Sequence, residues 1–122
     1  MVDLSNKKRF DLDERTQKFA MDVRVLLKRL MKTMSNIEDS KQLIRSSGSV
    51  AANYIEACEA LSRKDFIYRI KICRKEVKES ILFLHLLDFN NNSSHEEEKE
   101  YLIREGTELM KIFGSIITKA DR

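Results

Sequence analysis

The stretch Ser46 to Ala57, SSGSVAANYIEA, decides the fold of this chain because its residues suit either a loop or a helix. Glycine and serine ordinarily interrupt secondary structure, yet the apolar spacing continues through Gly48. At about 100° per residue, one side of a helix carries Ile37, Ile44, Ser47, Gly48, Ala51, Ile55 and Cys58. A loop would divide this stripe, so we predict one continuous helix with that side facing the core.

Outside this stretch, apolar residues also recur every three or four positions, and the chain contains no proline. Three serines have an acidic residue three positions later, which is the spacing of a capping box at a helix start: Ser35, Ser62 and Ser94. We therefore predict helices near 12–33, 36–61, 63–90 and 95–120, with Asn90 to Asn92 as the clearest loop. The other three predicted helices also have apolar stripes. The helix near 12–33 carries Phe19, Val23, Leu26 and Leu30, the helix near 63–90 carries Phe66, Ile70, Cys73, Val77 and Leu84, and the helix near 95–120 carries Leu102, Gly106, Leu109, Phe113, Ile116 and Ala120.

Short connections between such helices require neighbours to run antiparallel. The sequence thus predicts an all-α protein, an antiparallel up-down four-helix bundle. One domain over 12–122 is expected to follow a flexible N-terminal tail over 1–11, since 122 residues are enough for one core without disulfides or metal. Cys58 and Cys73 lack the CxxC spacing of metal or redox sites and are predicted to be reduced, buried thiols.

Several classes of function are disfavoured by missing patterns. No apolar segment has the length of a signal peptide core or a membrane span, so we expect a cytoplasmic protein without a membrane partner. The sequence has no Glu-x-x-His, no GxSxG and no GxxxxGK[ST] motif, and His85 and His95 belong to no triad pattern. We expect no enzymatic activity, no catalytic residue, no metal, no cofactor and no small-molecule substrate.

Self-association is suggested by two surfaces that lack charge. Opposite its predicted core side, the helix near 36–61 carries Ser46, Ser49, Val50, Asn53, Ala57 and Ala60. The segment 81–89 is apolar on nearly all sides and too short to span a membrane. We predict a subunit interface at Ser49, Asn53, Ala57, Ile72, Glu76, Glu79, Leu82, Phe83 and Leu86. An ordinary exposed face that is rich in Ser and Ala remains the alternative.

A basic arc is the remaining functional candidate. Opposite the core side of the helix near 63–90 lie the candidate nucleic-acid ligands Lys64, Lys71, Arg74, Lys75 and Lys78. Lysines and arginines on one arc can neutralise backbone phosphates, and repetition around an oligomer would multiply the effect. A merely solvated lysine face is the alternative, because the net charge is only +3. Tyr68 could stack on a base or pack half-buried in the bundle.

Three quoted segments also resemble a known family: SSGSVAANYIEA, Ser62-Arg-Lys-Asp-Phe66 and Lys75-Glu-Val-Lys-Glu-Ser80. They are similar to the bacterial four-helix-bundle proteins encoded by intervening sequences in 23S ribosomal RNA genes. That family is similar in turn to the accessory variability determinant of diversity-generating retroelements, a basic bundle that forms a ring of five and binds nucleic acid. The resemblance implies the bundle fold and a homo-oligomer, with a pentamer as the expected state, and it transfers no catalytic residue. RNA or DNA binding is the favoured function, and a protein-interaction scaffold without nucleic-acid binding is the alternative.

Overall fold

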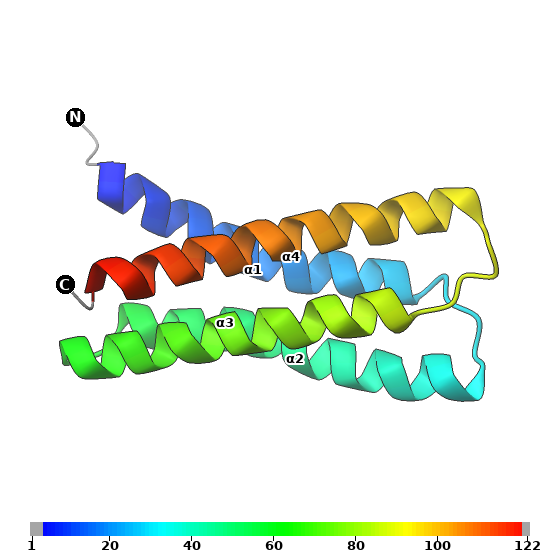
Figure 1. Cartoon of the computed structure of the whole chain (residues 1–122), viewed down its shortest axis with the longest axis horizontal. Helices are drawn as coiled ribbons and strands as arrows, with labels where there is room; N and C mark the ends of the chain where they lie inside the picture. The colour runs from blue at the N-terminus through cyan, green and yellow to red at the C-terminus, as the bar shows by residue number, and fades with distance from the viewer. Residues whose placement is uncertain (1–3, 121–122) are drawn as a thin grey trace.

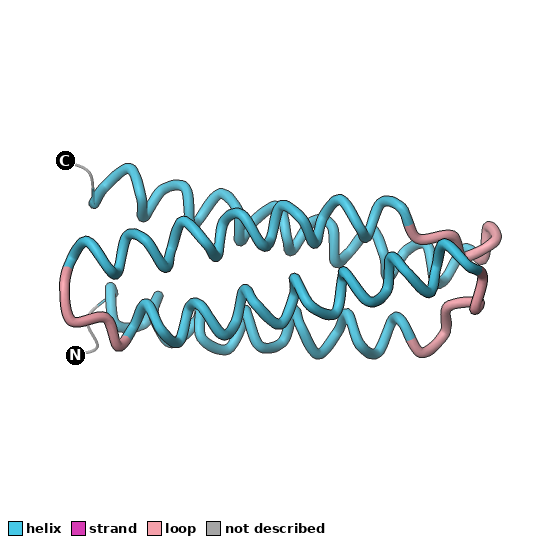
Figure 2. The backbone as a smooth tube through the Cα atoms, turned by 90° about the horizontal axis from the view of Figure 1, so that it is seen from below, coloured by secondary structure: helices cyan, strands magenta, loops and turns pink. Residues whose placement is uncertain are grey.

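The computed structural model describes the backbone of residues 4–120 and the side chains of residues 12–120. The described chain folds into α1 (Leu4–Leu27), α2 (Met34–Cys58), α3 (Arg63–Leu86) and α4 (Ser93–Ala120). Consecutive helices run in opposite directions, so α1 begins and α4 ends at the same end of the bundle (Figure 1). Two loops lie at one end and the α2–α3 loop lies at the other (Figure 2). This architecture confirms the predicted all-α up-down bundle.

The helix boundaries differ from the predicted ones at both ends. α1, α2 and α3 end at Leu27, Cys58 and Leu86 rather than near 33, 61 and 90, whereas the predicted start of α3 and end of α4 are confirmed. α1 begins at Leu4, so it includes residues 4–11 of the segment predicted as a tail, and residues 1–3 of that segment lie outside the described part. Ser62 is confirmed as a cap, because its Oγ accepts a hydrogen bond from the Asp65 backbone N–H at 3.1 Å. The predicted caps Ser35 and Ser94 are wrong by two residues each.

Thr33 and Asn92 take those capping positions. Thr33 Oγ1 accepts from the backbone N–H of Asn36 at 3.2 Å, and Asn92 Oδ1 accepts from that of His95 at 3.1 Å. A cap must have a non-helical backbone, as Thr33 does with φ −81° and ψ 164°, whereas Ser35 and Ser94 already lie inside their helices. The predicted loop over 90–92 is confirmed, since Asn90 and Asn91 have positive φ values of 54° and 61°.

The predicted stripes of α1, α3 and α4 face the bundle interior. Their fully buried members include Phe19, Val23, Leu26, Ile70, Cys73, Val77, Leu84, Leu109 and Phe113. Leu30, Phe66 and Ile116 are half-buried against this core. Each of these helices faces the core with its long apolar stripe, because only that orientation removes the stripe from water. No helix in the described range 4–120 is long and apolar enough to cross a membrane.

The orientation predicted for α2 is wrong, although its continuity through Gly48 is confirmed. Ile37, Ile44 and Ile55 of the predicted core side are exposed, as is Cys58, which was expected to be buried. The buried side is instead formed by Asn36, Leu43, Ser46, Ser47, Val50, Tyr54 and Ala57. Of the predicted core stripe, only Ser47 is fully buried.

Close contact between α2 and α3 explains this reversal. Ser46 Oγ and Ser80 Oγ lie 2.8 Å apart in the interior, and Cys73 Sγ donates to the Val50 carbonyl oxygen at 3.5 Å. Small side chains at the crossing allow the two backbones to approach, and the buried hydroxyls satisfy one another and nearby carbonyls. Bulky isoleucines on that side would hold the helices apart, so serine is buried while isoleucine faces water.

Candidate nucleic-acid interface

The basic arc predicted from the sequence is a continuous surface of α3. We call it the α3 basic surface and define it by Lys64, Lys71, Arg74, Lys75 and Lys78, all of which are exposed. None of these five side chains forms an ion pair with any described residue. From Lys64 to Lys78 the surface extends about 21 Å along the helix axis, at about 1.5 Å per residue.

Two open grooves follow this surface. One has a volume of about 500 Å³ and is lined by Lys71, Arg74, Lys75, Lys78 and Glu79 of α3 and by Ile117 of α4. The other has a volume of about 490 Å³ and is lined by Arg63, Lys64, Ile67, Tyr68 and Lys71. Because Lys71 lines both, the grooves are adjacent along α3. Cations outnumber acids in each groove, which favours an anionic ligand.

Tyr68 is 59% exposed, so the half-buried packing considered from the sequence is wrong. The guanidinium carbon of Arg69 lies over its ring, 5.8 Å from the centroid. Arg69 is held in turn by α2, because its Nη1 donates to Asn53 Oδ1 at 3.0 Å. The structure therefore places an accessible aromatic ring among the cations of the α3 basic surface.

The residues predicted as a subunit interface are divided between the interior and the surface. Ala57 and Glu76 are buried within the single chain and have almost no surface to offer a second copy. Ser49, Asn53, Ile72, Glu79 and Phe83 are half-buried. Leu82 and Leu86 are each 52% exposed. Beyond them α3 ends, and Leu87 and Phe89 turn into the core, which accounts for part of the apolar character of segment 81–89.

Glu76 and Glu79 are both paired with one arginine of the same chain. Arg45 of α2 donates from Nη1 to Glu76 Oε2 at 3.1 Å and from Nη2 to Glu79 Oε2 at 2.5 Å. The Glu76 carboxylate in particular raises the pKa of Arg45 above its ordinary value. Sequence reasoning missed this contact because the partners belong to different helices and no spacing rule connects them.

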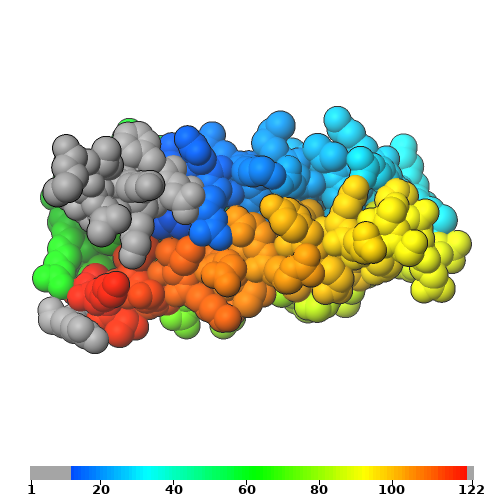
Figure 3. Space-filling model, turned by 90° about the horizontal axis from the view of Figure 1, so that it is seen from above, coloured from blue at the N-terminus to red at the C-terminus, as the bar shows by residue number. Residues whose placement is uncertain are grey.

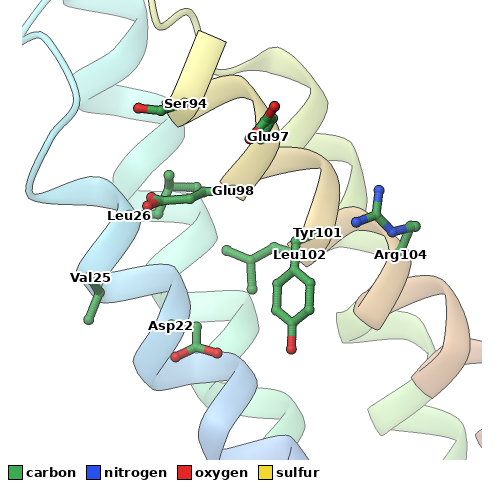
Figure 4. Close-up of a pocket in the computed structure, with 9 residues that line it drawn as sticks. All are labelled: Asp22, Val25, Leu26, Ser94, Glu97, Glu98, Tyr101, Leu102 and Arg104. Atoms are coloured by element: carbon green, nitrogen blue, oxygen red, sulfur yellow. The ribbon is translucent and has the colours of Figure 1, made fainter. Parts of the chain in front are cut away.

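A third groove, between α1 and α4, has a more acidic lining. It has a volume of about 550 Å³ and is lined by Asp22, Val25, Leu26, Ser94, Glu97, Glu98, Tyr101, Leu102 and Arg104 (Figure 4). It belongs to the face on which α1 and α4 lie side by side (Figure 3). Lys18 pairs with Asp22 at 2.6 Å, and Arg29 pairs with Glu98. Its lining has one cation and three carboxylates, two of which are paired with Lys18 and Arg29, so this groove offers a polyanion fewer cations than the α3 basic surface does.

The remaining reactive side chains are dispersed. Within residues described by the structure, no three His, Cys, Asp or Glu side chains are grouped as a metal ion would require. The Cys73 thiol is buried, as predicted, and burial raises its pKa to about 12. Both features make this thiol a structural group rather than a nucleophile.

Comparison with known proteins gives one family. A family profile described as 23S rRNA-intervening sequence protein matches residues 8–115. The chain is also similar to a crystal structure of a protein with unknown function from the S23 ribosomal protein family of Bacteroides thetaiotaomicron, with 33% sequence identity and a TM-score of 0.75. That similarity covers 87% of this chain and 97% of the other. A search of curated proteins gave no match.

Proposed function

Since the chain belongs to the 23S rRNA-intervening sequence protein family, we propose that it is a non-enzymatic, homo-oligomeric, cytoplasmic protein that binds RNA or DNA through the α3 basic surface. The observation that carries the proposal is the row of five cations that have no ion-pair partner among the described residues. A lysine or arginine on a helix surface can pair with an acid three or four residues away on the same helix. Here Glu79, which lines a groove together with lysines of this row, is already held by Arg45.

Phosphate neutralisation is the chemistry that this surface supports. Each phosphate contact releases condensed counterions, so the logarithm of the binding constant falls with the logarithm of salt concentration by about 0.9 per contact for duplex DNA and about 0.7 for single strands. Such contacts carry no sequence information. The α3 basic surface accordingly suits a ligand recognised by its backbone.

Self-association would support the same function, because it repeats a basic surface whose positive charge is modest in one copy. The exposed Leu82 and Leu86 continue the basic arc toward the end of α3, and burial of both against a second copy would remove apolar surface from water. We propose a pentamer, as in the accessory variability determinant that the family resembles. Several basic surfaces on one ring would bind one nucleic acid with higher avidity than any single surface.

Charge reversal tests the proposal directly. We expect the triple variant Lys71→Glu, Lys75→Glu and Lys78→Glu to lose binding to labelled RNA and DNA in fluorescence anisotropy titrations at about 50 mM salt, because like charges would then repel phosphate. The matched control reverses Lys28 and Lys32, which are exposed on the α1–α2 connection, and Lys41, which is exposed on α2. This control has the same net charge and should retain binding, since none of its three lysines belongs to the α3 basic surface or lines its two grooves.

Two results would contradict phosphate neutralisation. One is wild-type binding that does not weaken when salt is raised from about 50 to about 200 mM. The other is equal loss of affinity in the triple variant and its control. Either would remove the α3 basic surface as the binding site.

A protein-interaction scaffold is the competing function, and the same exposed leucines favour it. In that case Leu82 and Leu86 would contact a different protein and the lysines would only be solvated. Light scattering coupled to size exclusion separates the two functions. A monomer that binds no nucleic acid would support the scaffold, and an oligomer that dissociates when Leu82 and Leu86 are changed to Gln would support self-association.

A further inference from the structure

We propose that the α3 basic surface selects single-stranded over duplex nucleic acid, with one unpaired base stacked on Tyr68. This inference rests on the proposed function and names the ligand class for the same surface. It starts from the exposure of Tyr68, which the bundle core does not require. Tyr68 is 59% exposed, so even with the Arg69 guanidinium over its ring it leaves much apolar area in water unless a ligand covers it.

The ring is positioned between cations. Tyr68 follows Lys64 by four residues and precedes Lys71 by three, and residues at these spacings are neighbours on a helix surface. At about 100° per residue the three side chains emerge within roughly 60° of one another. A base on the ring would therefore have a lysine on each side, where the flanking phosphates of its strand could be neutralised.

The groove around Tyr68 has the composition of a base site. Ile67 and the tyrosine ring supply apolar surface, and Arg63, Lys64 and Lys71 supply positive charge. Among the residues that the structure describes, no acidic side chain lines it. Stacking between a base and an aromatic ring requires an accessible base face, and duplex bases are covered by their neighbours. A duplex could reach the lysines of this surface, whereas only an unpaired base could use the ring.

Tyr101 shows that exposure of a tyrosine alone does not indicate a base-stacking site. It is 50% exposed and also lines a groove, but that groove contains Asp22, Glu97 and Glu98. Glu97 has no ion-pair partner among the described residues and would repel the phosphates on either side of a stacked base. The same residue type with similar exposure and opposite surroundings provides an internal control.

Affinity measurements on both strand forms test the inference. The probes are a short labelled oligoadenylate, as RNA and as DNA, and the same strand annealed to its complement, all at about 50 mM salt. We expect Tyr68→Ala to weaken single-strand binding roughly 5- to 150-fold, the range that corresponds to one stacked base. Duplex binding should change less than about twofold, because phosphate contacts alone sustain it. Tyr68→Phe and Tyr101→Ala should match the wild type on both probes.

A second variant gives a signal that does not depend on affinity. The chain contains no tryptophan, so Tyr68→Trp would place a single indole at the proposed site. We expect its fluorescence to be quenched by the single strand and to change little with the duplex, and Tyr101→Trp to respond to neither. Since both tyrosines are exposed, these variants should unfold at the wild-type temperature.

The outcomes separate this inference from the proposed function. Unchanged single-strand affinity in Tyr68→Ala, together with loss of binding in the α3 lysine reversal, would overturn base stacking and leave phosphate binding in place. Equal weakening of single-strand and duplex binding in Tyr68→Ala would also overturn it. Failure of the wild type to bind any probe at about 50 mM salt would overturn both proposals.

Discussion

Replacement of Asn36 by alanine is expected to be among the most destabilising single changes on α2. Asn36 is buried at the end of the bundle where the α1–α2 and α3–α4 connections meet. Its Nδ2 donates to the carbonyl oxygens of Met31 at 3.0 Å and Asp88 at 2.8 Å. Its Oδ1 accepts from the backbone N–H of Asp88 at 3.0 Å. One side chain thus joins two connections that are far apart in the sequence.

The expected loss follows from these three hydrogen bonds. At a net value of about 1 kcal/mol each, their removal costs about 3 kcal/mol of unfolding free energy. Alanine has the higher helix propensity, which recovers up to roughly 0.7 kcal/mol, and the cavity left by the amide offsets part of that gain. We therefore expect Asn36→Ala to lose about 3 kcal/mol, which for a chain of this size lowers the melting temperature by roughly 12 °C.

Urea unfolding followed by circular dichroism, at one fixed protein concentration, measures this loss. The matched control is Ser35→Ala, an exposed neighbour that should change stability by less than about 0.5 kcal/mol. Asn36→Asp has nearly the same shape but lacks the two donors, so it should be at least as unstable as Asn36→Ala. An Asn36→Ala protein within about 1 kcal/mol of the wild type would refute the inferred role of the hydrogen bonds.

Two further predictions concern glycines and thiols. Gly114→Ala should stabilise the chain by up to about 1 kcal/mol, because an added Cβ meets no atom within 4 Å. Gly106→Ala should destabilise the chain, because the added Cβ would lie 3.0 Å from Ile81 Cγ1. Equal gains in urea unfolding would contradict the packing at Gly106. A thiol reagent should modify Cys58 in the native protein and Cys73 only after unfolding. Reaction of both thiols in the folded chain would contradict the burial of Cys73. Because the pKa of the Cys73 thiol is raised from 9.0 to about 12, the stability that its neutral form contributes is present below pH 9 and is lost as pH rises toward 12.

The orientation of α2 shows where sequence reasoning reached its limit. The number and order of the helices follow from local periodicity and capping chemistry, which act within a few residues, whereas the connections are longer than the sequence predicted. For α2, two opposite sides were plausible: a stripe of Ile37, Ile44 and Ile55, and a stripe of small residues around Ser46 and Val50. The isoleucine stripe has more apolar area, so the hydrophobic pattern alone favoured the wrong side.

The candidate site was predictable in part for a related reason. The exposure of Lys64, Lys71, Arg74, Lys75 and Lys78 follows from their position opposite a strong core stripe on the same helix. The exposure of Tyr68, the grooves around it and the capture of Glu76 and Glu79 by Arg45 depend on neighbouring helices. Those neighbours are brought together only by the fold.

The amino-acid sequence by itself determined that this chain forms four long antiparallel helices, that α1, α3 and α4 bury particular stripes, and that α3 carries a row of cations. Only the tertiary structure decided which side of α2 is buried, because that choice depends on how closely α2 approaches α3. The hydrogen bond between Ser46 and Ser80 and the contact of Cys73 with the Val50 carbonyl exist only at that short separation. Burial of serine in place of isoleucine is therefore a property of two helices together, which neither helix specifies alone.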